Sequence, residues 1–433
     1  MKTQTTPKIW PYAIVLIMLT GYFLCLRPLL GAGPSALIEG VALAAGTLVL
    51  IGALLLAGIA GIALALGKPR AQQLRRRGAV ALGALALILI IVGASQALAH
   101  TPQIRDADGK PLPGSIATVE AVELGGVRQW LIIRGQDVTK PVLLFLSGGP
   151  GASEAARVLR FNQALEEDYV VVIWEQRGCT KSYPSLNPKS DLTVDQYVAD
   201  IIELTEMLRM RFDEETITLV GHSWGTIIGV RAAQARPDLF THYVGTAQMV
   251  NVKEADLLIY DAVVEHARRA GDTAFVRTLE AQGPPPYVGK SPIRPYSTLF
   301  GREYTVFEVP NIRNEVYRRD GDILLLSLKL PEYGWLDRAY YLLGLMNTFN
   351  AIYPQLQEMD LRRDATQFEL PVTLILGRHD MNSPPQIPEA YYDLIEAPSK
   401  ELIFFEESGH GMIWEEADRF HEVMVGIATN ATR

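Results

Sequence analysis

The sequence predicts a domain of the α/β class behind an apolar N-terminal segment, and three observations lead to this prediction. Hydrophobic residues form 48% of the 433-residue chain while charged residues still reach 20%, so the apolar excess is concentrated in one region, the first hundred residues. After residue 115, short β-type runs alternate with helical patterns, as in a mostly parallel sheet flanked by helices. Finally, a small-residue turn at 221–225 joins an apolar strand directly to an apolar helix.

These patterns divide the chain into four regions. We expect a membrane segment over 1–100, the first half of the α/β domain over 101–251, an inserted helical cap over 252–368, and the second half of the domain over 369–433. The cap is predicted because its residues show helical segments and no regular strand alternation. An insertion of this kind is expected to form a lid over a site.

Three apolar runs in the first region, 9–26, 36–67 and 78–97, each reach the roughly 18–20 residues that cross a bilayer as a helix. None has the polar face that a soluble helix shows. The sequence therefore predicts three transmembrane helices and contact with a lipid bilayer. Glu39, a lone carboxylate in the second run, marks either a functional site or a position near the membrane interface.

The distribution of basic residues predicts the orientation of this segment. Lys68, Arg70 and Arg75–Arg77 crowd the loop between the second and third runs, whereas the first loop carries only Arg27. By the positive-inside rule the basic loop is cytoplasmic, so a multi-pass protein of the cell membrane with an extracytoplasmic α/β domain is expected. The alternative is release of the domain by cleavage after Ala99, because the third run also resembles a secretory signal.

Composition argues against several classes of protein. The formal net charge of −8 disfavours nucleic-acid binding, which needs a surplus of Lys and Arg. Cys25 and Cys179 are the two cysteines, too few for a disulfide framework. The sequence shows no zinc signature and no phosphate-binding G-K-[ST], so we expect neither a metal nor a cofactor.

The α/β domain is expected to contain strands and helices in alternation. The predicted strands are 116–122, 127–133, 142–146, 170–174, 216–220, 372–376 and 401–405. The predicted helices are 194–210, 226–235 and 390–395 in the domain, with 255–269 and 339–350 in the cap.

Ser223 is the predicted nucleophile. It is the central residue of a G-x-S-x-G motif at 221–225 that lies between an apolar strand and an apolar helix, the setting that a nucleophile elbow requires. A serine hydroxyl needs a base that is itself oriented by a carboxylate. Asp380 and His410 each follow a predicted strand, and the order Ser, Asp, His is that of α/β hydrolases.

An oxyanion hole is expected at the loop 147–151. This S-G-G-P-G sequence follows the strand 142–146, where glycine amides can approach a substrate carbonyl closely. We expect the amide of Gly148 or Gly149 to act together with that of Trp224.

Five motifs together resemble the proline iminopeptidase branch of the α/β hydrolases: S-G-G-P-G at 147–151, W-E-Q-R-G at 174–178, G-H-S-W-G at 221–225, G-R-H-D at 377–380 and S-G-H at 408–410. The similarity spans about 116–425. Members usually have H-G-G-P-G and W-D-Q-R-G, so this chain departs from the pattern at Ser147 and Glu175. The resemblance implies an α/β-hydrolase fold and cap carboxylates that hold the free amine of the substrate, with Glu254 as the candidate here.

The expected function is that of a membrane-anchored serine hydrolase, an aminopeptidase-like enzyme that cleaves small peptides or amides through an acyl-enzyme. An esterase or lipase-like hydrolase of carboxylic esters is the enzymatic alternative. A protein of another class, with a non-catalytic fold that binds a ligand or serves assembly, would not need Ser223, Asp380 and His410 together.

Overall fold

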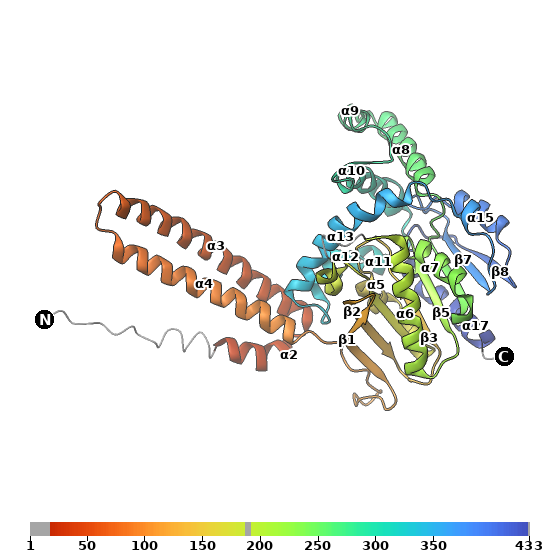
Figure 1. Cartoon of the computed structure of the whole chain (residues 1–433), viewed down its shortest axis with the longest axis horizontal. Helices are drawn as coiled ribbons and strands as arrows, with labels where there is room; N and C mark the ends of the chain where they lie inside the picture. Colours follow the sequence, from red (N-terminus) through yellow and green to blue (C-terminus); the bar gives the residue numbers. More distant parts are fainter. Residues whose placement is uncertain (1–17, 187–191, 432–433) are drawn as a thin grey trace. The chain divides into compact units, whose positions relative to one another are not determined.

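The computed structural model describes residues 18–186 and 192–431, and the chain divides into two compact units (Figure 1). The hairpin unit combines the N-terminal residues up to His100 with Ser327–Leu336, and the sheet unit comprises Thr101–Leu326 and Asp337–Arg433. A short piece of the predicted cap is therefore part of the N-terminal unit.

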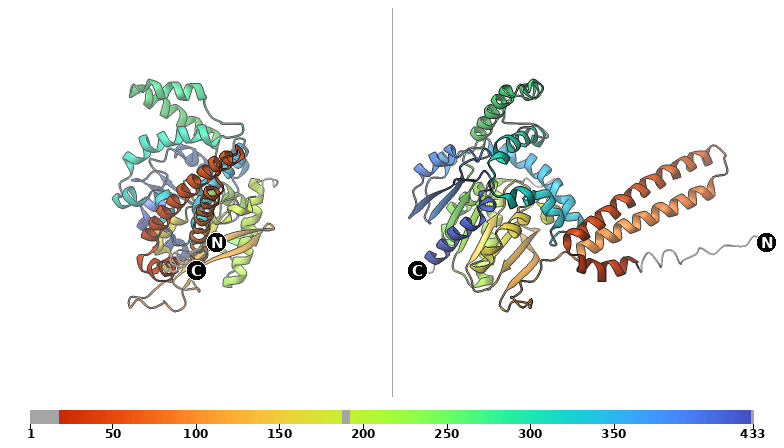
Figure 2. Two further views of the ribbon diagram at one scale, coloured as in Figure 1. Left: turned by 90° about the vertical axis from the view of Figure 1, so that its left-hand side faces the viewer. Right: turned by 180° about the vertical axis from the view of Figure 1, so that it is seen from behind.

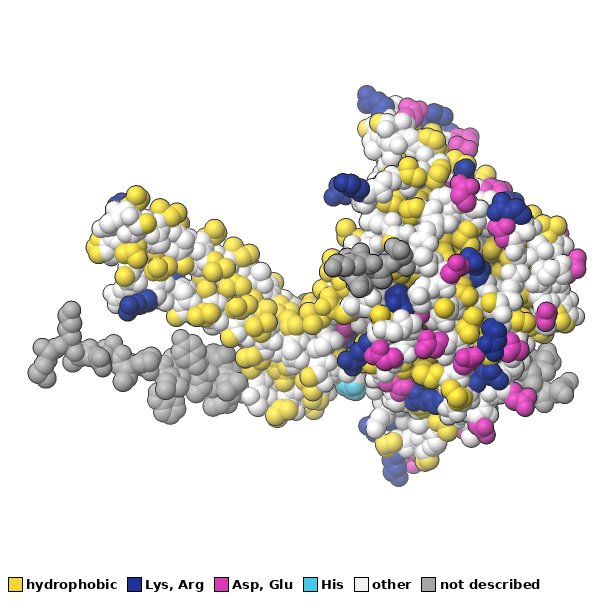
Figure 3. Space-filling view, in the orientation of Figure 1, with side chains coloured by type: hydrophobic (Ala, Val, Ile, Leu, Met, Phe, Trp, Pro, Cys, Tyr) yellow, Lys and Arg dark blue, Asp and Glu magenta, His cyan; other side chains and the backbone are white. Residues whose placement is uncertain are grey.

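The hairpin unit contains two long apolar helices, α3 (Ala32–Ala65) and α4 (Ala71–Ala97). Both are long and apolar enough to cross a membrane by length and composition. Figure 3 shows apolar side chains over much of their visible surface, whereas charged side chains are spread over the sheet unit.

The prediction of three membrane-spanning helices is not confirmed, because the described residues contain two candidates. Much of the first predicted span lies outside the described residues. Its described part belongs to a shorter apolar stretch, Met18–Leu30, made of η1 (Tyr22–Leu26) and α2 (Arg27–Leu30). This stretch ends at Gly31, whose φ of +76° interrupts the helical conformation.

One eight-stranded sheet, in the order β1-β2-β4-β3-β5-β6-β7-β8, forms the centre of the sheet unit. β1 pairs antiparallel with β2 and β2 with β4, and the remaining neighbours are parallel. The α/β class is thus confirmed. The strands are β1 (Ile116–Leu124), β2 (Val127–Gly135), β3 (Val142–Leu146), β4 (Val170–Glu175), β5 (Ile217–His222), β6 (Phe240–Thr246), β7 (Val372–Gly377) and β8 (Lys400–Phe405).

The central strand β6 was not predicted from the sequence. Its residues F-T-H-Y-V-G-T mix polar and apolar side chains, so they lack the apolar run of a buried parallel strand. Pairing with β5 and β7 satisfies the backbone there in spite of the weak pattern.

Helices of the sheet unit surround this sheet, and the cap helices gather beyond it (Figure 2). Around the sheet are α5 (Ala155–Phe161), η2 (Gln163–Glu167), η3 (Thr180–Ser185), α6 (Val194–Phe212), α7 (Trp224–Ala235), η4 (Pro237–Leu239), α15 (Gln386–Leu394), α16 (Met412–Glu415) and α17 (Ala417–Ala431). The cap contains α8 (Val252–Arg269), α9 (Thr273–Gln282), α10 (Ile293–Glu303), η5 (Tyr304–Glu308), η6 (Val309–Asn311), α11 (Glu315–Asp320), α12 (Ile323–Lys329), α13 (Trp335–Leu356) and α14 (Leu361–Asp364).

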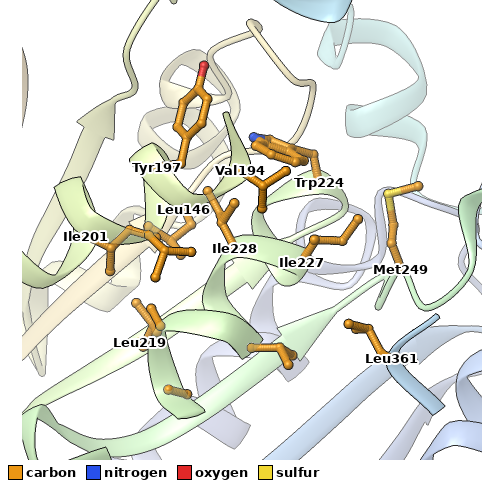
Figure 4. Packing of buried hydrophobic residues seen from close by; sticks show 14 of the residues in the cluster. Leu146, Val194, Tyr197, Ile201, Leu219, Trp224, Ile227, Ile228, Met249 and Leu361 are labelled. Atoms are coloured by element: carbon orange, nitrogen blue, oxygen red, sulfur yellow. The ribbon is translucent and has the colours of Figure 1, made fainter. Parts of the chain in front are cut away.

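The core positions the turn between β5 and α7. Ile227 and Ile228 of α7 pack with Leu146 of β3 and Leu219 of β5, all nearly inaccessible to solvent (Figure 4). Burying such side chains stabilises the fold by about 1.5–3 kcal/mol each. The start of α7 is thereby fixed at the carboxyl end of the sheet.

Candidate active site

Ser223 lies on a strained turn between β5 and α7. Its φ of +52° and ψ of −121° are unusual for a residue with a side chain and are maintained by the surrounding structure. Glycine is required on both sides, because a Cβ on Gly221 would lie 2.7 Å from the carbonyl oxygen of Gly225 and one on Gly225 would lie 2.1 Å from that of Leu146. The local geometry is that of a nucleophile elbow.

Hydrogen bonds from the W-E-Q-R-G motif connect this elbow to the loop 147–151. Gln176 accepts a hydrogen bond from Trp224 Nε1 at 3.0 Å and donates through Nε2 to the carbonyl oxygen of Ser147 at 2.9 Å. One buried amide therefore holds both segments that the sequence predicts to form the oxyanion hole.

His410 and Asp380 form a hydrogen-bonded pair at the carboxyl ends of β8 and β7. His410 Nδ1 lies 3.0 Å and 3.1 Å from the two carboxylate oxygens of Asp380, and the backbone N–H of Ser383 donates to Asp380 at 2.7 Å. With Nδ1 donating to the carboxylate, Nε2 of His410 is left as the basic nitrogen. The structure thus brings together two of the three predicted catalytic residues.

The hydroxyl of Ser223 contacts a different group. It donates to Met249 Sδ at 3.8 Å, and within the part of the chain that the structure describes no hydrogen bond joins it to His410. Catalytic hydrogen bonds are often long before substrate binds.

The Gly148 amide is already engaged. It donates to Glu154 Oε2 at 2.7 Å, and the Glu154 carboxylate also lies 2.9 Å from His222 Nδ1. Burial opposes ionisation of Glu154, but the charge and hydrogen bond of His222 outweigh it and hold the pKa of Glu154 below its ordinary value. Burial likewise opposes protonation of His222, while Glu154 raises the pKa of the imidazole.

Gly149 is consequently the better candidate for the first oxyanion donor. Its φ of +124° is accessible mainly to glycine, and a Cβ there would lie 2.9 Å from the Ala152 amide nitrogen. Trp224, the first residue of α7, presents the second amide at a helix N-terminus, where the helix dipole favours negative charge.

Buried carboxylates surround His410, and the sequence analysis missed them. Glu308, the last residue of η5, accepts a hydrogen bond from the backbone N–H of His410 at 3.2 Å. Glu415 of α16 accepts one from Gly409 at 3.1 Å. Glu303, at the end of α10, has a buried Oε1 that finds no hydrogen-bond partner among the described residues.

These carboxyl groups resist ionisation. Burial, reinforced by the charge of Asp380, raises the pKa of Glu303 to about 8. Burial and the neighbouring carboxylates raise the pKa of Glu308 well above its ordinary value, and burial raises that of Glu415 to about 7. A positive charge placed near His410 would therefore be stabilised, because it would offset both the repulsion among these carboxyl groups and the cost of burying their negative charge.

The donor atoms of Glu308, Asp380 and His410 lie within 4.8 Å of one another, a spacing that could also accommodate a metal ion. The hydrogen bonds within the group account for its geometry without one, since His410 donates to both Asp380 and Glu308. The expectation that no metal is needed stays a prediction.

Glu254 is paired with another side chain in the structure, and the ammonium-binding role that the resemblance implied for it stays a prediction. It lies at the start of α8, where its backbone N–H is capped by Asn251 Oδ1 at 2.9 Å, and its carboxylate forms an ion pair with Arg362. The side chain is 41% exposed. A helix-start position and an existing cationic partner account for this glutamate without a ligand.

A sequence profile of the alpha/beta hydrolase fold family matches residues 141–417, more than half of the chain. With the eight-stranded sheet, the elbow at Ser223 and the His410–Asp380 pair, this match defines the class. The chain belongs to the alpha/beta hydrolase fold family.

Its relatives are proline iminopeptidase-like, as the motifs predicted. The chain is 31% identical over 312 residues to the probable aminopeptidase YbaC of Bacillus subtilis, covering 72% of this chain and 96% of that protein. It is 24% identical over 293 residues to a proline iminopeptidase of Saccharolobus solfataricus, and this match covers 65% of this chain and 83% of that protein. The proline iminopeptidase-related protein of Thermus thermophilus shares the fold, with a TM-score of 0.51, 21% identity, and coverage of 73% of this chain and 98% of that one.

Proposed function

We propose that this protein is a membrane-anchored serine hydrolase with aminopeptidase-like activity on small substrates that carry a free α-amine. The observation that carries the proposal is the buried carboxyl of Glu303, which lacks a partner for Oε1 among the described residues and lies in the same charged group as Glu308 and Asp380. An unsatisfied buried carboxyl is costly, and a bound cation would favour its ionised form.

The α-ammonium of an aminoacyl substrate fits this requirement. One carbon separates the amine from the carbonyl that is attacked, so the anionic group must lie close to the catalytic base. Glu308, hydrogen-bonded to the backbone of His410, meets that condition. A substrate with an acylated amine would leave the carboxyl groups without a counter-charge.

The reaction follows from the proposed roles of Ser223, His410 and Asp380. Ser223 Oγ attacks the carbonyl carbon while His410 Nε2 takes its proton, and the amides of Gly149 and Trp224 bind the resulting oxyanion. The imidazolium then protonates the leaving nitrogen, the C–N bond breaks, and an acyl ester on Ser223 remains. Water, deprotonated by His410, hydrolyses this ester and regenerates the serine.

Membrane anchoring is the second part of the proposal, and α3 and α4 support it by length and hydropathy. The basic residues Lys68, Arg70 and Arg75–Arg77 lie in the turn between these helices and in the first turns of α4. The positive-inside rule then assigns this end of the hairpin to the cytoplasm and the sheet unit to the opposite side. Protease added to intact cells is expected to digest the sheet unit, and digestion only after cell disruption would contradict this orientation.

The activity is tested by substrate comparison with the purified full chain. We expect turnover of free aminoacyl amides, and an N-acetylated amide should react at least about 10-fold more slowly, because a charged hydrogen bond is worth about 1.5–3 kcal/mol. Equal turnover of both amides would remove the aminopeptidase assignment, and a preference for simple esters would favour the esterase alternative.

A fluorophosphonate probe tests the serine mechanism separately. The wild-type chain is expected to be labelled, because the reagent reacts with an activated serine. Ser223→Ala should abolish labelling while leaving the thermal unfolding temperature unchanged. Labelling that persists in this variant would assign the nucleophile to another residue.

A further inference from the structure

Glu154 and His222 form a buried pair that the proposed reaction does not use. His222 is 1% exposed and Glu154 is 7% exposed. Nδ1 of His222 lies 2.9 Å and 3.1 Å from the two carboxylate oxygens of Glu154, and Nε2 lies 2.9 Å from the carbonyl oxygen of His410. The imidazole of His222 therefore connects the segment that follows β3 with the loop that carries the proposed base.

The partners of His222 favour its charged form. A carbonyl oxygen can only accept a hydrogen bond, so Nε2 carries a hydrogen. Glu154 also accepts the N–H of Gly148 at 2.7 Å, which stabilises the ionised carboxylate, and Nδ1 of His222 then donates to it. Burial and the charge of Arg157 lower the pKa of His222, but the charge and hydrogen bond of Glu154 outweigh them and raise it. These contacts favour an imidazolium at His222 and a carboxylate at Glu154.

Glu154 also holds one peptide group of the predicted oxyanion loop. The N–H of this peptide, that of Gly148, donates to Glu154, and its carbonyl oxygen, that of Ser147, accepts a hydrogen bond from Gln176 at 2.9 Å. Because both polar ends of the peptide are engaged, rotating it would break a buried hydrogen bond. The next amide along the chain is that of Gly149, the proposed oxyanion donor, so the orientation of that donor depends on Glu154.

The departure of this chain from the family pattern at position 147 fits this arrangement. Members of the family usually have a histidine there, whereas Ser147 accepts a hydrogen bond through Oγ from the backbone N–H of Glu154 at 3.3 Å. The small side chain thus contributes to the placement of the carboxylate.

The backbone of His410 is held at both of its polar groups. Its N–H donates to Glu308 at 3.2 Å, its carbonyl oxygen accepts from His222, and its ring pairs with Asp380. The centroids of the His222 and His410 rings lie 5.0 Å apart, and Trp414 contacts the His222 ring edge-on at 4.6 Å. Loss of the His222 imidazole would therefore release the backbone of the residue that supplies the proposed base.

We propose that Glu154 and His222 are positioning residues, a carboxylate–imidazolium pair that holds the oxyanion loop and the backbone of His410 in place around Ser223. The inference rests on the serine mechanism proposed above and does not depend on the amine of the substrate. A misplacement of about 1 Å can cost about 100-fold in rate. The pair should therefore affect the chemical step and not the binding of a reagent.

The proposal is tested by the kinetics of fluorophosphonate labelling of the purified full chain. Glu154→Ala and His222→Phe should each lower the maximal labelling rate by about 10- to 100-fold and leave the half-saturating reagent concentration within about twofold. Glu154→Gln should stay within about threefold of the wild type, because its amide can accept from Gly148 and donate to a neutral His222. The double variant Glu154→Ala/His222→Phe should lose no more than either single variant, since the two residues act as a unit.

Glu166→Ala is the matched control, because Glu166 forms a similarly buried ion pair with Arg134 at 2.7 Å. This variant should unfold at a lower temperature and keep its labelling rate within about twofold. Unchanged labelling of folded Glu154→Ala and His222→Phe would overturn the inference and leave the serine mechanism intact, and an equal loss of rate in Glu166→Ala would do the same. A wild-type chain that is not labelled would overturn the serine mechanism and this inference with it.

Nuclear magnetic resonance of the full chain in detergent, with histidine labelled by nitrogen-15, tests the charge of the pair even if an alanine variant does not fold. At pH 7 both ring nitrogens of His222 should carry a hydrogen, in a signal that is assigned by its loss in His222→Phe. Glu154→Gln should leave a hydrogen on one ring nitrogen. A single protonated nitrogen at His222 in the wild type, or two in Glu154→Gln, would overturn the carboxylate–imidazolium pair.

Discussion

Two buried glutamates, Glu39 in the hairpin unit and Glu303 in the cap, differ in how their carboxylates are satisfied. Glu39 accepts hydrogen bonds from Arg27 Nε at 2.9 Å and Trp335 Nε1 at 3.0 Å. Glu303 has an oxygen without a partner among the described residues, and its pKa is raised. Burial of a carboxylate alone does not indicate function. A buried carboxylate with its donors in place holds structure together, and one that lacks them is a candidate for binding a ligand.

The largest expected effect on activity comes from the Asp380–His410 pair, whose carboxylate also raises the pKa of Glu303. Asp380→Asn should lower kcat by about 10⁴-fold, because the amide no longer holds His410 in the tautomer that leaves Nε2 basic. Asp168→Asn is the matched control, since Asp168 also pairs with a histidine, His421, at 2.9 Å. Steady-state kinetics on an aminoacyl amide should show a large loss in the first variant and less than about twofold in the second. Equal losses would mean that Asp–His pairing in this protein serves stability only.

Glu303 itself is expected to affect substrate binding. Glu303→Gln should raise KM for free aminoacyl amides by about 10- to 100-fold, because the ammonium loses its counter-charge, and should leave KM for simple esters unchanged. Glu254→Gln is the matched control in the same cap, since its carboxylate is paired with Arg362. A larger effect at Glu254 than at Glu303 would restore the assignment made from the family resemblance.

Glu39 should act on stability and not on catalysis. Glu39→Ala leaves Arg27 and the Trp335 indole N–H without their acceptor, at a cost of about 1–3 kcal/mol. Thermal unfolding of the full chain in detergent should shift to lower temperature, whereas Leu37→Ala, at an exposed position of α3, should not shift it comparably. A change in KM with no loss of stability would contradict the contrast between the two glutamates.

Stability should also depend on pH through Glu303. In the folded chain burial and the charge of Asp380 raise the pKa of Glu303 to about 8, whereas an unfolded glutamate has a pKa of about 4.3. The folded state binds more protons between these values, so this contribution to stability falls as the pH rises through that window, by up to about 1.4 kcal/mol per pH unit. The free energy of unfolding, measured with denaturant, should differ less between pH 5.5 and pH 8 for Glu303→Gln than for the wild type. An unchanged difference would mean that Glu303 ionises normally.

The smallest effect is expected from chelators. Because Asp380 and Glu308 both accept hydrogen bonds from His410, dialysis against EDTA should leave the turnover of aminoacyl amides within about twofold of its starting value. Loss of activity on dialysis, with recovery on addition of one divalent metal, would assign the Glu308, Asp380 and His410 group to a metal site.

Sequence patterns alone predict the α/β class, seven of the eight strands and the spacing around Ser223. These features depend on local patterns: apolar runs bounded by turn residues, and glycines that a sharp turn requires. The order of Ser223, Asp380 and His410 along the chain also indicated which residues to expect at the carboxyl ends of the strands.

Which glutamates lie near the His410–Asp380 pair could be seen only in the folded structure. Glu308 accepts a hydrogen bond from the backbone of His410, and Glu303 and Glu308 both interact with the charge of Asp380. Glu254 instead pairs with Arg362, which is distant in sequence. Ionisation and exposure are set by neighbours brought together in space, and the linear sequence carries no local signal of them.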